Sequence, residues 1–256
     1  FIQFSNQLFN PLIDVTQNFS IIQTSMIAAT RVFEVIDNTD YEPEQFGKVN
    51  EIKNGKIEFK NVTFSYDGKR NVLKNINFVV NPGETVAFVG STGSGKSSIM
   101  NLFLRFYDFK EGEILIDELP IQHYSKEVLR DKIGLVLQDP FLFHGTVASN
   151  IRMYQDITDE EVKQASEFVD AHHFIEQLPQ GYENKVSEKG STFSSGERQL
   201  IAFARTIAAN PKILILDEAT ANIDSQTEEV IQTSLKKMRN GRTTLAIAHR
   251  LSTIQD

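Results

Sequence analysis

The stretch Gly90-Ser91-Thr92-Gly93-Ser94-Gly95-Lys96-Ser97 decides the fold of this chain of 256 residues. It matches the pattern G-x-x-x-x-G-K-[ST], follows the short apolar run Thr85–Val89 and precedes a helical run over Ser98–Tyr107. Glycines let such a loop turn its backbone N–H groups onto phosphate oxygens, and the helix adds its positive N-terminal end. We therefore predict a phosphate-binding loop in which Lys96 provides charge for the outer phosphates and the Ser97 hydroxyl ligates Mg²⁺. An ordinary glycine-rich turn is the alternative interpretation.

A pair of carboxylates ends a second apolar run. Asp217 and Glu218 directly follow Ile213–Leu216, which has the length and composition of a buried strand. Seen alone, the pair could be a solvated acidic turn. In a parallel sheet, however, ligands gather at the carboxyl ends of strands, which would bring the pair beside the phosphate loop. We therefore expect Asp217 to hold Mg²⁺ and Glu218 to act as the general base on an attacking water.

Two more runs of the strand type end in residues that can reach a phosphate. Gln138 follows Ile133–Leu137, and its amide can ligate Mg²⁺ and orient water although it cannot be a strong base. His249 follows Thr243–Ala248, where it is expected to reach the terminal phosphate. A lone histidine at a strand end is more often structural or exposed. The prediction for His249 therefore rests on the polar residues that end the other predicted strands.

Composition excludes several classes of function. The chain has 26 Lys and Arg against 34 Asp and Glu, and its net charge of −8 disfavours broad binding to nucleic acid. It has no Cys, which excludes a disulfide scaffold, thiolate metal sites and cysteine catalysis. No uninterrupted apolar run reaches the ~18 residues of a simple membrane span, so we expect no complete span in the chain as given.

An apolar stripe marks the N-terminal region as one long helix. Its spacing alternates between four and three residues, while Gln, Asn, Ser and Thr fill the opposite face between Asp14 and Arg31. The helix either packs on a soluble partner or its own domain, or ends a membrane helix that lines a bundle or aqueous cavity. Pro11 predicts a kink or an early turn. The stripe consists of Leu8, Leu12, Val15, Phe19, Ile22, Met26, Ala29, Phe33 and Ile36.

Turn-forming residues separate this helix from the rest. The segment 38–54 contains Asn, Asp, Pro and Gly, and we place a linker there. The uneven alternation over Lys56–Tyr66 predicts an edge or antiparallel strand with a bulge, and Leu73–Val80 predicts a second strand. The sequence beyond mixes short strands and helices, without an internal repeat.

The combination of motifs resembles the nucleotide-binding domain of ATP-binding cassette (ABC) transporters over about residues 55–256. The resemblance implies an α/β fold of the P-loop NTPase type, with a mostly parallel sheet core, an antiparallel β subdomain and a helical subdomain. It also implies ATP as substrate, Mg²⁺ as cofactor and a catalytic set of Glu218, His249, Gln138 and Lys96. The motifs are, in chain order, the Walker A loop Gly90–Ser97, the Q-loop Gln138, the signature Phe193–Glu197, the Walker B strand Ile213–Glu218, the D-loop Ala221–Asp224 and the switch His249.

Tyr66 completes the ATP site that the resemblance implies. It stands at the family's adenine-stacking position, and such stacking is typically worth ~1–3 kcal/mol. By pattern alone it would be an ordinary tyrosine at a strand end. The residues predicted to bind the phosphates are Gly90, Ser91, Thr92, Gly93, Ser94, Gly95, Lys96, Ser97 and Ser98, and those predicted to ligate the metal are Ser97, Gln138 and Asp217.

Two segments favour an exporter whose membrane and ATPase domains share one chain. Val186-Ser-Glu-Lys-Gly190 resembles the exporter segment that contacts intracellular helices, and the N-terminal helix resembles the last membrane helix of such exporters. We therefore expect residues 1–37 to end a transmembrane helix, 38–54 to form a linker and 55–256 to form the nucleotide-binding domain. In that case the earlier membrane helices and the family's final helices are missing. The protein is then expected in the cell membrane, with its ATPase domain on the cytoplasmic side.

The signature departs from the family's usual Leu-Ser-Gly-Gly-Gln, since this chain has Phe193-Ser194-Ser195-Gly196-Glu197. In the family these residues act in trans, over the γ-phosphate held by a partner's Walker A loop. Ser195 adds a side chain where the backbone approaches closely, and Glu197 adds negative charge unless it is turned away. An altered signature beside an intact Walker A loop favours one subunit of a heterodimer with a second ABC half-transporter. A tolerated variant in a homodimer is the alternative.

Two other functions remain open from the sequence. A soluble ABC-type ATPase that acts on DNA would carry a long coiled coil between its Walker A loop and its signature motif. One that acts on the ribosome would carry two nucleotide-binding domains in one chain. A non-hydrolysing nucleotide sensor would require damage to the catalytic set. The transported substrate, whether a small molecule, a lipid or a peptide, cannot be identified from this domain.

Overall fold

The computed structural model of the chain describes residues 2–39, 47–187, 190–217 and 225–248. It divides into two compact units, Phe1–Glu44 and Gln45–Asp256, and each has a structure of its own. The first holds one helix, and the second holds every described strand.

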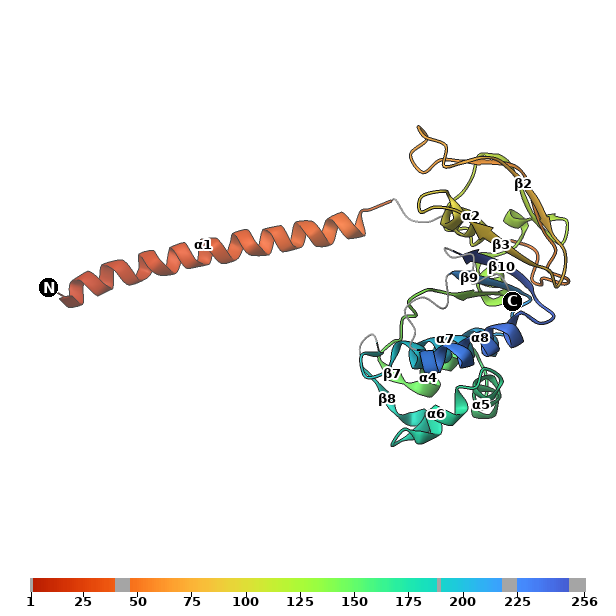
Figure 1. Cartoon of the computed structure of the whole chain (residues 1–256). Coiled ribbons are helices and arrows are strands. Elements are labelled where there is room, and N and C mark those ends of the chain that lie inside the picture. Colours follow the sequence, from red (N-terminus) through yellow and green to blue (C-terminus); the bar gives the residue numbers. More distant parts are fainter. Residues whose placement is uncertain (1, 40–46, 188–189, 218–224, 249–256) are drawn as a thin grey trace. The chain divides into compact units, whose positions relative to one another are not determined.

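Helix α1 (Ile2–Ile36) forms the first unit and runs unbroken through Pro11, so the early turn allowed by the sequence does not occur (Figure 1). Its segment Phe9–Ile36 has a mean hydropathy of 1.3, and none of it is buried. By length and composition this segment could cross a membrane, although it holds no uninterrupted apolar run of the length used in the sequence analysis. Uncharged polar residues interrupt the apolar run without making the helix hydrophilic on average.

The threonine hydroxyl groups on α1 are satisfied within the helix itself. Three threonine side chains donate hydrogen bonds of 2.7–2.9 Å to carbonyls four residues earlier in the chain. A polar group that already has a partner costs less to place in an apolar environment. The three donors are Thr16, Thr24 and Thr30.

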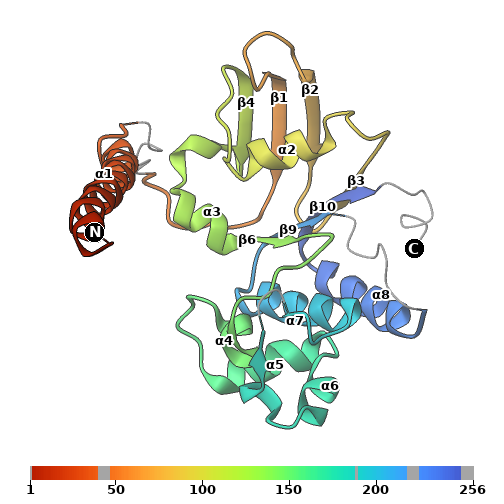
Figure 2. The same ribbon diagram turned by 90° about the vertical axis from the view of Figure 1, so that its left-hand side faces the viewer.

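A parallel sheet forms the centre of the second unit (Figures 1 and 2). Side chains of β9 alternate between two hydrophobic clusters: Ile213 and Ile215 lie in one, and Leu214 and Leu216 lie in the other. Burial on both faces explains why this strand reads as a continuous apolar run. In spatial order the strands are β3 (Thr85–Val89), β10 (Thr243–Ala248), β9 (Ile213–Asp217) and β6 (Ile133–Val136).

A second, antiparallel sheet lies on the first cluster. Strand β1 (Ile57–Phe64) pairs on both sides, so it is a central strand and the edge position allowed by the sequence is wrong. The predicted bulge is present, with Asn61 at a φ of 50° and register shifts beyond Phe59. The uneven alternation of apolar residues indicates the bulge, but it does not indicate how many strands pair with β1. The sheet order is β2 (Leu73–Val80), β1, β4 (Glu111–Ile116) and β5 (Leu119–Pro120).

Helices cover both faces of the parallel sheet. Figure 2 shows α2 (Lys96–Phe103) and α3 (Lys126–Lys132) on one side, and α7 (Ser195–Ala208) and α8 (Ser225–Arg239) on the other. The helical part beyond α7 adds α4 (Val147–Arg152), α5 (Asp159–Phe168) and α6 (His172–Gln177), with the short helix η2 (Gly181–Glu183) and the short pairing of β7 (Gly145–Thr146) and β8 (Lys185–Val186). The short helix η1 (Ile121–His123) follows β5 and contacts the antiparallel sheet instead. The predicted α/β fold with antiparallel and helical parts is confirmed.

The end of the expected linker is part of the second unit. Ile52 is fully buried in its core, and Asp117 accepts hydrogen bonds from the backbone N–H groups of Lys53, Asn54 and Lys56 at 2.8–3.0 Å. The chain is therefore anchored to the antiparallel sheet just before β1 begins.

Candidate active site

The carboxyl ends of the parallel strands meet at one edge of the sheet. Ala248 at the end of β10 pairs with Val89 of β3, and Ile247 pairs with Asp217 of β9. The phosphate loop, Asp217 and the segment after β6 that carries Gln138 therefore leave the same edge, as the sequence predicted. Glu218, His249 and the segment Ala221–Asp224 lie outside the described residues, so their roles stay predictions.

The phosphate loop depends on two glycines with left-handed backbones. Gly93 has a φ of 82°, and Gly95, immediately before α2, has a φ of 93°. A Cβ atom added at Gly95 would lie 2.8 Å from a methyl group of Leu73 and 3.3 Å from the carbonyl oxygen of Val72. Any other residue there would strain the loop and push it away from β2.

Lys96 lies inside the loop and is largely buried. Its Nζ donates hydrogen bonds to the carbonyl oxygens of Gly90 at 2.7 Å and Ser91 at 3.0 Å, and to Ser94 Oγ at 3.4 Å. The ammonium group is thus held by the loop's own oxygens, with a positive charge at the start of α2. A buried cation beside a helix N-terminus fits a polyphosphate, which can replace those oxygens as the acceptor.

The residues expected to hold Mg²⁺ fit that ion by their chemistry. Ser97 is exposed on the first turn of α2, Asp217 ends β9, and Gln138 is exposed beyond β6. Hydroxyl, carboxylate and amide oxygens are the hard ligands that Mg²⁺ accepts, together with water and substrate phosphates. No group of three or more His, Asp or Glu side chains that could hold a metal occurs in the part of the chain that the structure describes.

Tyr66 is fixed beside the helix that follows the loop. Its hydroxyl lies 3.0 Å from Ser98 Oγ and accepts a hydrogen bond from Asn101 Nδ2 at 3.2 Å. Its ring meets the rings of Phe64 and Tyr107 edge-on, at centroid distances of 4.7 and 4.8 Å. About half of Tyr66 remains exposed, so a ring held in place has a free surface for stacking. The sequence analysis missed Asn101 and Tyr107, which no motif marks.

The signature residues form the N-terminus of α7. Ser194 caps the helix by accepting from Glu197 N at 3.2 Å, and the Glu197 carboxylate accepts from Ser194 N at 2.7 Å. The carboxylate is therefore turned back onto its own helix end. Gly196 has a packing role that the sequence did not reveal, because a Cβ there would lie 2.3 Å from the Thr227 side chain on α8.

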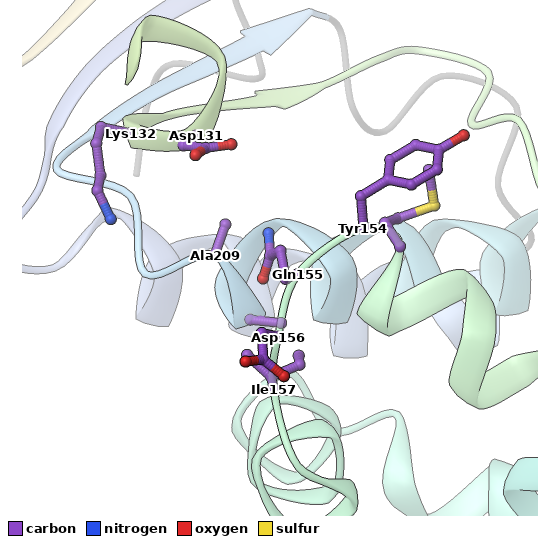
Figure 3. Close-up of a pocket in the computed structure, with 9 residues that line it drawn as sticks. Asp131, Lys132, Tyr154, Gln155, Asp156, Ile157 and Ala209 are labelled. Carbon is purple, nitrogen blue, oxygen red and sulfur yellow. The ribbon is translucent and has the colours of Figure 1, made fainter. Parts of the chain in front are cut away.

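A hollow of about 510 Å³ lies elsewhere, between the end of α3, the segment 153–157 and the end of α7 (Figure 3). None of its lining residues belongs to the phosphate loop or to the other predicted site residues. The lining residues are Asp131, Lys132, Met153, Tyr154, Gln155, Asp156, Ile157, Ala208 and Ala209.

A parallel sheet flanked by helices, with a glycine-rich loop between strand and helix and a carboxylate at the end of a neighbouring strand, defines a P-loop NTPase. The family model described as ABC transporter matches residues 73–221, which is more than half of the chain. The chain therefore belongs to the ABC transporter family and carries its ATP-binding, ATPase domain.

Relatives match this chain over almost its full length. The ABC transporter ATP-binding protein exp8 of Streptococcus pneumoniae is 62% identical over all of this chain and 44% of its own length. An ATP-dependent lipid A-core flippase of Saccharophagus degradans is 45% identical over 96% of this chain and 41% of its own length. A solved structure of a bacterial Atm1-family ABC exporter with ATP bound matches 98% of this chain and 44% of its own, with a TM-score of 0.80 and 40% identity. The chain thus spans less than half the length of these proteins.

Proposed function

We propose that this chain is the ATP-hydrolysing motor of an ABC exporter, which closes on ATP to drive a substrate across a membrane. The observation that carries the proposal is the phosphate loop, whose buried Lys96 lies at the same sheet edge as Asp217 and Gln138. The exporter assignment is supported by the likeness to an ATP-bound exporter and by an N-terminal helix apolar enough to cross a membrane.

In the proposed reaction, water attacks the γ-phosphorus of ATP and the bond to ADP breaks. The loop N–H groups and Lys96 bind the phosphates, and Tyr66 orients the adenine. Glu218 takes the proton of the attacking water, while Gln138 and His249 orient the water and the γ-phosphate. Ser97, Gln138 and Asp217 would hold Mg²⁺, which would supply positive charge beside the phosphates.

We further propose that a second ABC half-transporter completes each site, because signature residues act in trans. The Glu197 carboxylate lies on the helix end that would face the partner's γ-phosphate, and two anions at one helix end oppose each other. This supports a heterodimer in which the site using this chain's signature is the weaker one. The proposed location is the cell membrane, with the ATPase domain on its cytoplasmic side. A lipid, a peptide or another small molecule is the proposed cargo, and nucleic acid is not a partner.

Phosphate release from Mg²⁺-ATP by the purified full-length protein in lipid tests the proposal. We expect turnover, with a higher rate when the cognate half-transporter is co-purified. A protein that binds ATP but releases no phosphate, alone or with a partner, would be a sensor and would overturn the proposed function. A high rate alone that no partner changes would instead contradict the heterodimer.

A further inference from the structure

The segment that carries Gln138 is held by the signature helix. Gln199 Nε2 on α7 lies 3.4 Å from the carbonyl oxygen of Leu137, directly before Gln138. Arg205 Nη1, also on α7, donates to the carbonyl oxygen of Phe141 at 3.0 Å. The same helix therefore contacts the backbone on both sides of Gln138.

Arg205 also bonds to a buried asparagine that holds the rest of this segment. Its Nε donates to the Asn150 carbonyl oxygen at 2.7 Å and its Nη2 to Asn150 Oδ1 at 3.1 Å. Asn150, on α4 and only 1% exposed, bonds both backbone groups of Phe143 at 2.8 Å and the carbonyl oxygen of Thr146 at 3.0 Å. One guanidinium group thus ties α4, α7 and the segment after Gln138 together.

The chemistry of this junction requires arginine. The guanidinium group donates to three amide oxygens, one from each of its nitrogens, and the Arg205 Cζ atom also lies 5.7 Å from the centre of the Phe143 ring. Burial lowers the pKa of Arg205 to about 10, so the group stays charged at neutral pH. Lysine has a single nitrogen and cannot bond all three oxygens with the same geometry.

We propose that Arg205, acting through Asn150, is a positioning residue for Gln138, and that it joins the Gln138 segment to α7, the helix that Ser194 caps. The proposal rests on the proposed ATPase function. The proposal implies that a movement of α7, caused by a nucleotide at its N-terminus in the partner's site, also displaces Gln138 in this chain's own site. The reason is that α7 and the segment that carries Gln138 are joined by hydrogen bonds.

A double-mutant cycle in the full-length protein tests the proposal through Arg205→Met and Gln138→Ala. If Arg205 acts through Gln138, each single change lowers kcat by about tenfold or more, and the double variant is no slower than Gln138→Ala alone. The ATP affinity of Arg205→Met should stay within about threefold of wild type, since the phosphate loop is untouched. Arg205→Lys should recover only part of the rate.

Arg242→Met is the matched control. Arg242 is also partly buried, donates to the carbonyl oxygens of Pro211 and Met238, and lies 5.9 Å from the centre of a phenylalanine ring, Phe168. It does not bond the Gln138 segment, so its loss should lower the melting temperature without lowering kcat of the folded protein.

Each outcome decides between a positioning and a structural role. Losses that multiply in the double variant, or a kcat loss in Arg242→Met as large as in Arg205→Met, would overturn the proposal while the ATPase function stands. If Arg205→Met fails to fold, the cycle is run with Arg205→Lys and read in the same way. A wild-type protein without ATP hydrolysis would overturn the proposed function itself.

Discussion

Lys96 illustrates at the scale of one residue how the site is prepared for an anion. Its ammonium group is buried and bonded to the carbonyl oxygens of Gly90 and Ser91, and a charge-assisted bond to phosphate can replace those bonds. Hydrogen bonds to charged groups contribute about 1.5–3 kcal/mol. We expect Lys96→Ala to weaken ATP binding by about tenfold or more in a direct titration. Lys163→Ala, which removes a half-buried lysine on α5 away from the loop, is the control, and equal affinities of both variants would contradict this role.

Tyr66 gives a second prediction at this scale, since its ring and its hydroxyl have separate contacts. The ring meets Phe64 and Tyr107 edge-on, and the hydroxyl bonds Ser98 and Asn101. Loss of a stacking ring costs about 1–3 kcal/mol, so Tyr66→Ala should weaken ATP binding by about five- to 150-fold. Tyr66→Phe keeps the ring and should bind within a few-fold of wild type. If Tyr66→Phe loses as much affinity for ATP as Tyr66→Ala, the hydroxyl group and not the ring supports the nucleotide.

At the scale of one element, the start of α7 depends on the capping box between Ser194 and Glu197. Glu197→Gln keeps an oxygen acceptor for Ser194 N, whereas Glu197→Ala removes it. We expect the alanine variant to lose about 0.5–2 kcal/mol of unfolding free energy, the range for a lost cap, and the glutamine variant to lose less than about 0.5 kcal/mol. Thermal unfolding measures both. Equal losses would mean that the charge, not the hydrogen bond, stabilises the helix.

The elements also show what a sequence can and cannot predict. Strands β9 and β10 could be predicted because burial on both faces leaves an apolar run. Strand β3 lies at the edge of the sheet and is only partly buried, but its apolar residues and the motif directly after it mark its position. The central position of β1 could not, because the number of neighbours depends on β4, far along the chain. The packing of Gly196 on Thr227 and the bonds of Arg205 to the Gln138 segment could not be predicted either. They depend on side chains that only the folded chain brings together.

At the scale of the whole molecule, α1 is long and apolar enough to cross a membrane. Its apolar side chains are exposed around the helix, including Phe9, Ile13 and Phe19, and contiguous exposed apolar surface is costly in water. We expect the full-length protein to sediment with membranes and to require detergent for extraction. Recovery in the soluble fraction after cell lysis would favour a soluble ABC-type ATPase instead.

The most direct test of the ATPase motor is the turnover of full-length Glu218→Gln measured beside its ATP affinity. Loss of a general base lowers turnover by ~10²–10⁴-fold, and the amide leaves the phosphate loop, Lys96 and Tyr66 intact. We therefore predict that steady-state phosphate release falls by this factor while the variant binds ATP as tightly as wild type. Near-normal phosphate release by Glu218→Gln would contradict the assignment of the catalytic base and the mechanism built on it.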